Sequence, residues 1–445
     1  MPGQEHPAAR GRVAGPAVPP GRAAGQADAT AGAGGVPGTA GHPPSRSLAA
    51  RANHPAVAAL IATLAATAFA LARWQTWADG RISRFILVGR HFATPSQLPH
   101  GMPVARTYGY DGQFFYRLAL NPLNFHHTAY GITVDRPYRF MRIGYPVLTW
   151  VLSLGQHYLV PVLLVVINIA AIGALGYLGA MFAARGGRHA LAGLLIPGYF
   201  GLLTSLSRDT AEPLAAVFLL AGLLAVRSRR PVPAAVLLTC GALTRETVMV
   251  AVAAIAIGRV IGILRGRVTG ARTLSPGRED LAWVVPAVIF AAWQVVVKAA
   301  TGSIPLLADG GRNAGTPFIA PLHAVRYNLG HLHMHQFEQY DLWFLELAIL
   351  ACFAAAALTC LRYTTVPAHE RLAFVLYLAE ICVVTPSTWN SVDADMRSFI
   401  EVYLLAVIIL LGTPRRTLGA WLLPSLAALT LPALIVVTQR RLTIS

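Results

Sequence analysis

From Ile143 to Ala184 the chain carries no Asp, Glu, Lys or Arg, and this uncharged stretch constrains the fold more than any other feature of the sequence. A helix needs about 20 apolar residues to cross roughly 30 Å of hydrocarbon. Of the 445 residues, 12% are charged and 55% are hydrophobic, and the mean hydropathy is +0.54. Soluble domains carry roughly 25% charged residues. The composition therefore excludes a water-soluble globular enzyme and predicts an all-α polytopic membrane protein.

Gly155 divides the uncharged stretch unequally. Residues 145–154 predict a short helix in the membrane interface, whereas 158–184 predict a full span. These runs are continuous and lack the alternation of lipid-facing strands, which argues against a transmembrane barrel. Together with the other apolar blocks they predict about eleven transmembrane helices, and the remaining ten lie at 55–72, 189–206, 213–226, 232–244, 247–264, 281–300, 341–361, 372–388, 398–412 and 418–438.

Two segments fall outside this pattern. Residues 1–54 are rich in Ala, Gly and Pro and show no apolar periodicity, so we expect a disordered tail. Residues 73–142 are polar, aromatic and interrupted by Gly and Pro, and they predict a long loop between the first two spans. Loops of that length are usually functional.

The chain carries a formal net charge of +17, and most of its arginines flank apolar segments. Arginines in such positions orient membrane proteins, because short cytoplasmic loops are enriched in them, and they also meet anionic lipid headgroups. The charge therefore indicates a lipid bilayer as the partner and no nucleic acid. If the tail is cytoplasmic, every short Arg cluster between spans lies on the cytoplasmic side, and only Arg440 and Arg441 lie outside. The sequence therefore predicts a multi-pass protein of the cell membrane with its tail in the cytoplasm. This topology puts most acids on the external face, where we expect the chemistry.

Asp111 lies in the long loop within the sequence Tyr-Asp-Gly-Gln-Phe-Phe-Tyr. Gly109 and Gly112 permit a sharp turn around the acid, and the apolar residues that follow have helical spacing. We expect this helix to lie along the membrane surface and to hold the carboxylate at the hydrocarbon boundary. The alternative is that Asp111 only caps the helix.

Three segments of the sequence resemble the GT-C superfamily: the loop around Asp111, residues 138–146 (Tyr-Arg-Phe-Met-Arg-Ile-Gly-Tyr-Pro) and residues 243–246 (Leu-Thr-Arg-Glu). These are multi-span, mannosyltransferase-like enzymes that use polyprenyl-phosphate sugars as donors. The resemblance implies a catalytic membrane module over residues 55–300, and residues 301–445 match only as variable C-terminal transmembrane helices. It also implies a glycan or lipid acceptor and transfer with inversion.

The resemblance further implies that Asp111 acts as the general base on the acceptor hydroxyl, and a carboxylate within hydrogen-bond reach can take that proton. Its neighbours Tyr110 and Gln113 are then expected to bind substrate. Several members of the superfamily have paired acids at this point, whereas this chain has one. A divalent metal is therefore possible but not favoured, and no other cofactor is expected.

The departing polyprenyl phosphate gains charge and needs fixed cations. Arg142, Arg208 and Arg245 are the candidates on the external face, because the planar guanidinium can donate two parallel hydrogen bonds to a phosphate. The alternative for Arg245 is a simple ion pair with its neighbour Glu246 or a role in topology.

Three acids are candidates for substrate binding: Asp209, Glu212 and Glu246. The first two precede a predicted span, where helix capping and the helix dipole give an alternative explanation that we favour slightly. The histidines at 331, 333 and 335 have no acid or Cys of matching spacing, so we expect interfacial histidines and no metal site.

A non-enzymatic transporter or lipid-linked-sugar flippase is the main alternative to an enzyme. Glu380 supports it, because an acid near the middle of a span is costly and often marks a transport pathway. No internal repeat and no paired broken helices accompany it. A polymerase or ligase that attaches whole oligosaccharides is a third, weaker hypothesis.

Overall fold

The computed structural model of the protein describes residues 52–268, 277–308, 315–333, 339–389, 395–414 and 419–443. Residues 1–51, most of the predicted tail, lie outside the described residues. Everything described belongs to the unit Arg46–Ser445. This part of the chain is mostly helical, and its strands are two residues long.

Among the described residues, six helices are long and apolar enough to cross a membrane, which agrees with a helical membrane protein. They correspond to six of the predicted spans. These helices are α2 (Pro55–Thr76), α5 (Val160–Arg185), α9 (Val248–Val268), α10 (Leu281–Thr301), α14 (Gln339–Cys360) and α18 (Gly419–Thr443).

The other five predicted spans form shorter elements. The segment 189–206 is interrupted around Pro197, which has no backbone N–H to donate, so it forms the 3-10 turn η5 (Ala190–Leu195) followed by α6 (Phe200–Ser207). The remaining four are α7 (Glu212–Arg227), α8 (Pro231–Thr244), α15 (Ala368–Val383) and α17 (Ile400–Leu411).

The predicted short helix before Gly155 is confirmed as α4 (Gly144–Leu152). The 3-10 turn η4 (His157–Leu159) then leads into α5. The other short helices are α11 (Pro305–Ala308), α13 (Ile319–Leu329) and α16 (Pro386–Trp389), and η6 (Arg278–Asp280) precedes α10.

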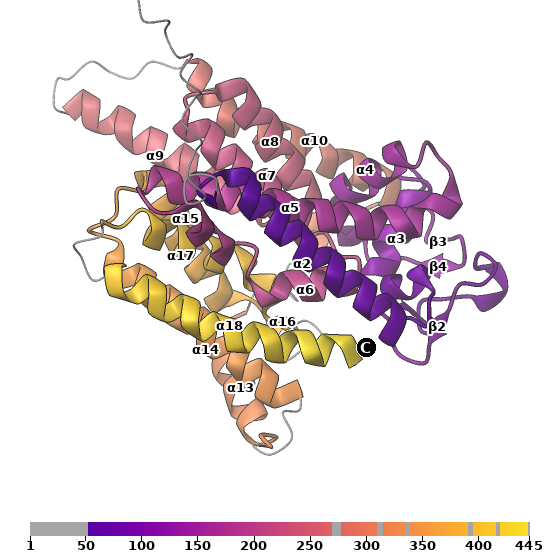
Figure 1. The fold of residues 1–445 in the computed structure, drawn as a ribbon. Coiled ribbons are helices and arrows are strands. Elements are labelled where there is room, and N and C mark those ends of the chain that lie inside the picture. Colours follow the sequence, from indigo (N-terminus) through magenta and orange to yellow (C-terminus); the bar gives the residue numbers. More distant parts are fainter. Residues whose placement is uncertain are drawn as a thin grey trace, which may run out of the picture. The chain divides into compact units, whose positions relative to one another are not determined.

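Helices α2 and α5 run side by side (Figure 1). A Cβ built on Gly176 of α5 would lie 2.7 Å from the carbonyl oxygen of Ala58 in α2, so only glycine permits this approach. Small residues at such contacts let helix backbones pack closely in membrane proteins, where apolar lipid supplies no hydrophobic drive for association.

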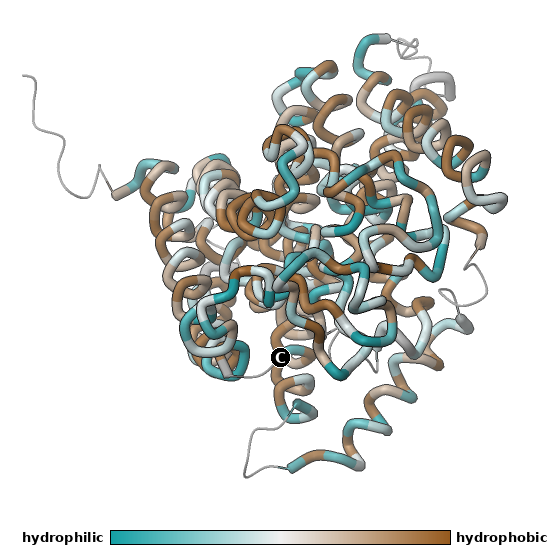
Figure 2. The backbone as a smooth tube through the Cα atoms, turned by 90° about the vertical axis from the view of Figure 1, so that its right-hand side faces the viewer, coloured by the Kyte–Doolittle hydropathy of each residue, from teal (hydrophilic) through white to brown (hydrophobic). Residues whose placement is uncertain are grey.

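The long loop between α2 and α4 contains short elements and packs at one end of the helices, on the right in Figure 1. Figure 2 faces this side and shows many hydrophilic segments in front of mostly hydrophobic helices. Two pairs of short strands stabilise the loop: β1 (Val88–Gly89) pairs in parallel with β2 (Val104–Ala105), and β3 (Thr128–Ala129) pairs antiparallel with β4 (Ile132–Thr133). The loop elements are η1 (Ile82–Ile86), β1 (Val88–Gly89), η2 (Pro95–Gln97), β2 (Val104–Ala105), α3 (Gly112–Leu120), β3 (Thr128–Ala129), β4 (Ile132–Thr133) and η3 (Pro137–Met141).

Helix α3 differs from the expected surface helix, because all its residues are buried. It packs against α4 and α5, so both its apolar and its polar side chains face protein.

Helix α17 is also buried along its whole length, between α14 and α15. A helix that is hydrophobic all round belongs in a protein core, and its 12 residues extend only about 18 Å. The 3-10 turn η7 (Asp395–Phe399) precedes it. These two elements bring the C-terminal part of the chain to the loop around Asp111.

Candidate active site

Two glycines fix the backbone around Asp111. Gly109 has a φ of +72°, in the left-handed region that favours glycine. A Cβ on Gly112 would lie 2.3 Å from the carbonyl oxygen of Arg208 and 2.9 Å from that of Ile86. The start of α3 is therefore held directly against the segment between α6 and α7.

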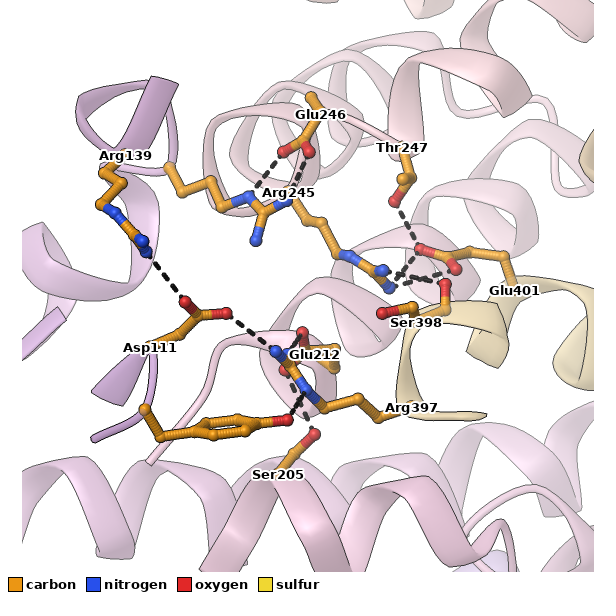
Figure 3. A network of polar contacts seen from close by, with 12 residues as sticks. Asp111, Arg139, Ser205, Glu212, Arg245, Glu246, Thr247, Arg397, Ser398 and Glu401 are labelled. Carbon is orange, nitrogen blue, oxygen red and sulfur yellow. Dashed lines mark hydrogen bonds and ion pairs between the residues drawn. The ribbon is translucent and has the colours of Figure 1, made fainter. Parts of the chain in front are cut away.

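Asp111 occupies the N-cap position of α3, but its side chain makes no capping hydrogen bond. Instead, Arg139 Nη1 donates to Asp111 Oδ1 at 2.9 Å, and Arg397 Nη2 donates to Oδ2 at 2.8 Å (Figure 3). Burial alone would raise the pKa of Asp111, but these two guanidinium groups outweigh it and hold the pKa well below its usual range. The carboxylate is therefore ionised, and 25% of the side chain is exposed.

Arg397 connects several polar groups around Asp111. Its Nε donates to the hydroxyl of Tyr110 at 2.6 Å, and its Nη1 donates to Glu212 Oε1. Ser205 Oγ donates to the other carboxylate oxygen of Glu212 at 3.1 Å. Glu212 lies in the first turn of α7, and these bonds hold its carboxylate between Arg397 and Ser205.

Arg142 and Glu246 form a bidentate ion pair, with Arg142 Nε to Glu246 Oε2 at 2.8 Å and Nη2 to Oε1 at 2.5 Å. A Cβ on Gly144 would lie 2.4 Å from Thr244 Oγ1, so the two segments approach closely. Burial raises the pKa of Glu246, but Arg142 outweighs this and lowers it; the same pair raises the pKa of Arg142. Both groups are charged.

Arg245 does not pair with its neighbour Glu246. Its Nη1 donates to both carboxylate oxygens of Glu401 in α17, at 2.9 and 3.1 Å, and its Nη2 donates to the carbonyl oxygen of Ser398 at 2.9 Å. Thr247 Oγ1 also donates to Glu401, at 2.5 Å. Each side chain of the ion pair is 5% exposed, so this contact fixes the α8–α9 connection to the C-terminal helices.

These groups surround a cavity of about 890 Å³. Its lining contains charged side chains from the long loop and from the two turns that precede α9 and α17. It also contains apolar residues of α11, α15 and α17. Seven of the nine predicted site residues line it: Tyr110, Asp111, Gln113, Arg142, Glu212, Arg245 and Glu246. Glu380, the acid that supports the transporter alternative, lines it as well.

Two predicted site residues, Arg208 and Asp209, do not line this cavity. Arg208 is 1% exposed, with its guanidinium 4.2 Å from the ring centre of Tyr110. Asp209 is fully buried, and neither of its carboxylate oxygens has a hydrogen-bond partner in the described part of the chain. Both residues lie behind the wall formed by Tyr110 and the start of α3.

Gln113 lines the cavity, but its amide is engaged by the loop. Its Oε1 accepts from the backbone N–H of Gly89 at 3.0 Å, and its Nε2 donates to the carbonyl oxygen of Tyr108 at 3.1 Å. The side chain therefore ties the loop to α3. Among the predicted histidines, His331 stacks on Tyr327 and bonds its carbonyl oxygen at 2.8 Å, whereas His335 lies outside the described residues.

Sequence reasoning missed several charged residues of the cavity, among them Arg139, Arg397 and Glu401. Arg139 stands inside the segment 138–146, only three residues before Arg142, so its motif was visible but its partner was not. Arg397 is 286 residues from Asp111 along the chain. No local spacing indicates such a pair.

Comparisons of the chain with protein-family models, with curated proteins and with solved structures find no match.

Proposed function

We propose that this chain is an integral membrane glycosyltransferase of the GT-C type, which moves a sugar from a polyprenyl-phosphate donor to an extracytoplasmic glycan or lipid acceptor with inversion. One observation carries the proposal. Asp111 makes no capping bond and points instead into a large cavity, where it is ionised and lies between guanidinium groups.

The two kinds of cavity wall support an amphiphilic donor. Arginines surround Asp111, and Leu306, Ile381, Val384 and Val402 contribute apolar surface to the same cavity. A prenyl chain is driven into apolar surroundings by the hydrophobic effect, while a phosphate is held by guanidinium groups through charge-assisted hydrogen bonds. A lipid-linked phosphate can contact both walls at once, with its prenyl chain on the apolar side and its phosphate on the arginines.

In the proposed reaction the acceptor hydroxyl oxygen attacks the anomeric carbon of the sugar from the face opposite the phosphate. The new carbon–oxygen bond forms as the bond from the anomeric carbon to the phosphate oxygen breaks, and the phosphate leaves with the electron pair. The hydroxyl proton passes to Asp111. Inversion follows, because the sugar is transferred in one displacement.

The resting ion pairs of Asp111 make it a weak base, since a low pKa reduces the driving force for proton transfer. Arg139 and Arg397, which lower that pKa, are also the cations nearest to the reacting carboxylate. When these arginines donate hydrogen bonds to an incoming phosphate, they stabilise the negative charge of Asp111 less strongly. The pKa of Asp111 then rises. Donor binding thereby activates the base.

Among the three arginines predicted to bind phosphate, Arg142 is the best candidate. It lines the cavity, and Glu246 engages its Nε and Nη2 but not its Nη1. The charge of Arg245 is matched by the buried Glu401, and Arg208 lies outside the cavity lining. We propose that Arg142 holds the phosphate together with Arg139 and Arg397.

For the topology, we propose a cytoplasmic amino terminus and an extracytoplasmic loop over residues 73–142 in the cell membrane. The arginine clusters of the short connections support this orientation. The shorter helices of the fold complete the proposed crossings, about eleven in all, by packing against the six long ones.

Incubation of the purified protein with radiolabelled polyprenyl-phosphate sugars and membrane lipids tests the proposal. We expect label to move from one donor of the panel to a lipid or glycan acceptor, and we expect this transfer to be lost in Asp111→Asn. A transporter or flippase would instead move the labelled lipid across a liposome membrane without transferring its sugar, and that outcome would contradict the proposal.

A further inference from the structure

Glu380 is the one acid in the described lining of the cavity that has no arginine partner. The cavity has six acids and five arginines in its described lining. Five of the acids form ion pairs within 4 Å: Asp111 with Arg139 and Arg397, Asp135 with Arg136 and Arg139, Glu212 with Arg397, Glu246 with Arg142, and Glu401 with Arg245. The described residues provide Glu380 with no ion pair or side-chain hydrogen bond.

The surroundings of Glu380 make this unpaired carboxyl group costly. It lies on α15, an apolar helix, between Tyr377 and Val384, which line the same cavity. The charged groups that act on it are Glu401, Arg245 and Glu246, and these already form pairs with Arg142 or with each other. A polar group left without a hydrogen bond in such a place costs free energy, and an acid within a predicted span is by default a candidate for binding a ligand.

The pairing of the charged groups in the lining defines the class of that ligand. Each of the five arginines in the described lining pairs with another acid, so none of them lies beside Glu380 to bind a phosphate at that end of the cavity. A neutral group with hydroxyls fits better, since a carboxyl group can accept their hydrogen bonds without a counterion. We propose that Glu380 binds a hydroxyl of the donor's sugar and helps to select that sugar, while the phosphate lies toward Asp111. This inference rests on the proposed glycosyl transfer and adds the place of the sugar.

Two variants of Glu380 separate hydrogen bonding from charge. Glu380→Gln keeps an acceptor oxygen at the same place, whereas Glu380→Leu has a similar size and no polar atom. The probes are farnesyl phosphate and its mannosyl, glucosyl and galactosyl esters, titrated into the detergent-solubilised full chain by calorimetry. Glu279→Leu, an exposed glutamate away from the cavity, serves as the matched control.

We expect Glu380→Leu to bind the preferred glycosylated probe about 10- to 100-fold more weakly than the wild type, the effect of leaving a buried sugar hydroxyl without its hydrogen-bond partner. Its affinity for farnesyl phosphate should not change, which also shows that the variant is folded. Glu380→Gln should stay within about fivefold of the wild type for every probe.

Three results would overturn the inference alone: wild-type affinity of Glu380→Leu for all probes, equal weakening for farnesyl phosphate and its esters, or a loss in Glu380→Gln as large as in Glu380→Leu. The last would identify a cation as the partner. Failure of the wild type to bind any glycosylated probe would instead contradict the proposed function, and the inference with it.

Discussion

At the scale of single residues, the sequence allows two roles for Asp111, a helix cap and a reactive carboxylate, and the contacts of the side chain distinguish them. A residue before a helix is a candidate cap, and the sequence allows that role. The side chain instead bonds Arg139 and Arg397, and no capping bond is present. The carboxylate of Asp111 therefore faces the cavity and does not cap the helix.

The low pKa of Asp111 has a consequence for stability against pH. Because the pKa is lower in the folded chain than the ordinary value of about 3.9, ionised Asp111 stabilises the fold above that value, and this contribution is lost as the pH falls below it. We expect the difference in melting temperature between the wild type and Asp111→Asn to be constant from pH 7 to pH 5 and to shrink below about pH 4. A difference that already shrinks between pH 7 and pH 5 would mean that the pKa is raised instead.

At the scale of elements, the long helices were predictable and the exceptions have local causes. Apolar length alone identifies α2, α5 and the other four long helices. The interruption at Pro197 was missed. The complete burial of α17 was also missed, because a window of apolar residues does not distinguish a lipid-exposed helix from one buried in protein. Likewise α3 has a helical pattern, but its burial on all sides depends on what α4 and α5 place around it.

The close packing at Gly112 predicts a strong effect of a single methyl group. Gly112→Ala puts a Cβ 2.3 Å from the carbonyl oxygen of Arg208, so either α3 or that segment must move. We expect a loss of about 1 to 3 kcal/mol of stability and a marked loss of sugar transfer, because Asp111 moves with α3. The control is Gly258→Ala, whose new Cβ would have its nearest neighbour at 3.5 Å. Wild-type melting and transfer in Gly112→Ala would show that this approach does not position the acid.

At the scale of the whole molecule, the site depends on contacts between distant parts of the sequence. Asp111, Glu246 and their motifs were predicted because their signals are local. Arg397 and Glu401 come from the C-terminal part, which the sequence indicates only as further helices, and their partners are 286 and 156 residues away. Such pairs can be identified only from the way the distant segments pack in the folded chain.

The buried pair of Arg245 and Glu401 predicts a non-additive effect of mutation. Arg245→Met leaves Glu401 buried without its counterion, which costs about 3 to 5 kcal/mol. The double variant Arg245→Met/Glu401→Leu removes both charges, so we expect it to melt close to the wild type. If the double variant retains the full loss, or if Arg245→Met melts like the wild type, the pair does not hold the C-terminal helices in place.

The proposed orientation is open to labelling in intact cells. In a background without the four native cysteines, a cysteine at the exposed position 96 should react with a membrane-impermeant maleimide, whereas one at the exposed position 229 should react only after permeabilisation. The reverse pattern would place the loop in the cytoplasm and remove the extracytoplasmic site.

The most direct test of the central claim is single-turnover sugar transfer by Asp111→Asn, with thermal unfolding measured on the same preparation. Asn keeps the shape of the side chain but cannot take the acceptor's proton. The account predicts a folded protein whose transfer rate is lower by about two to four orders of magnitude, while the control Asp79→Asn, on an exposed side chain, transfers like the wild type. A folded Asp111→Asn protein with undiminished transfer would contradict the account and make Asp135, in the same cavity, the next acid to test.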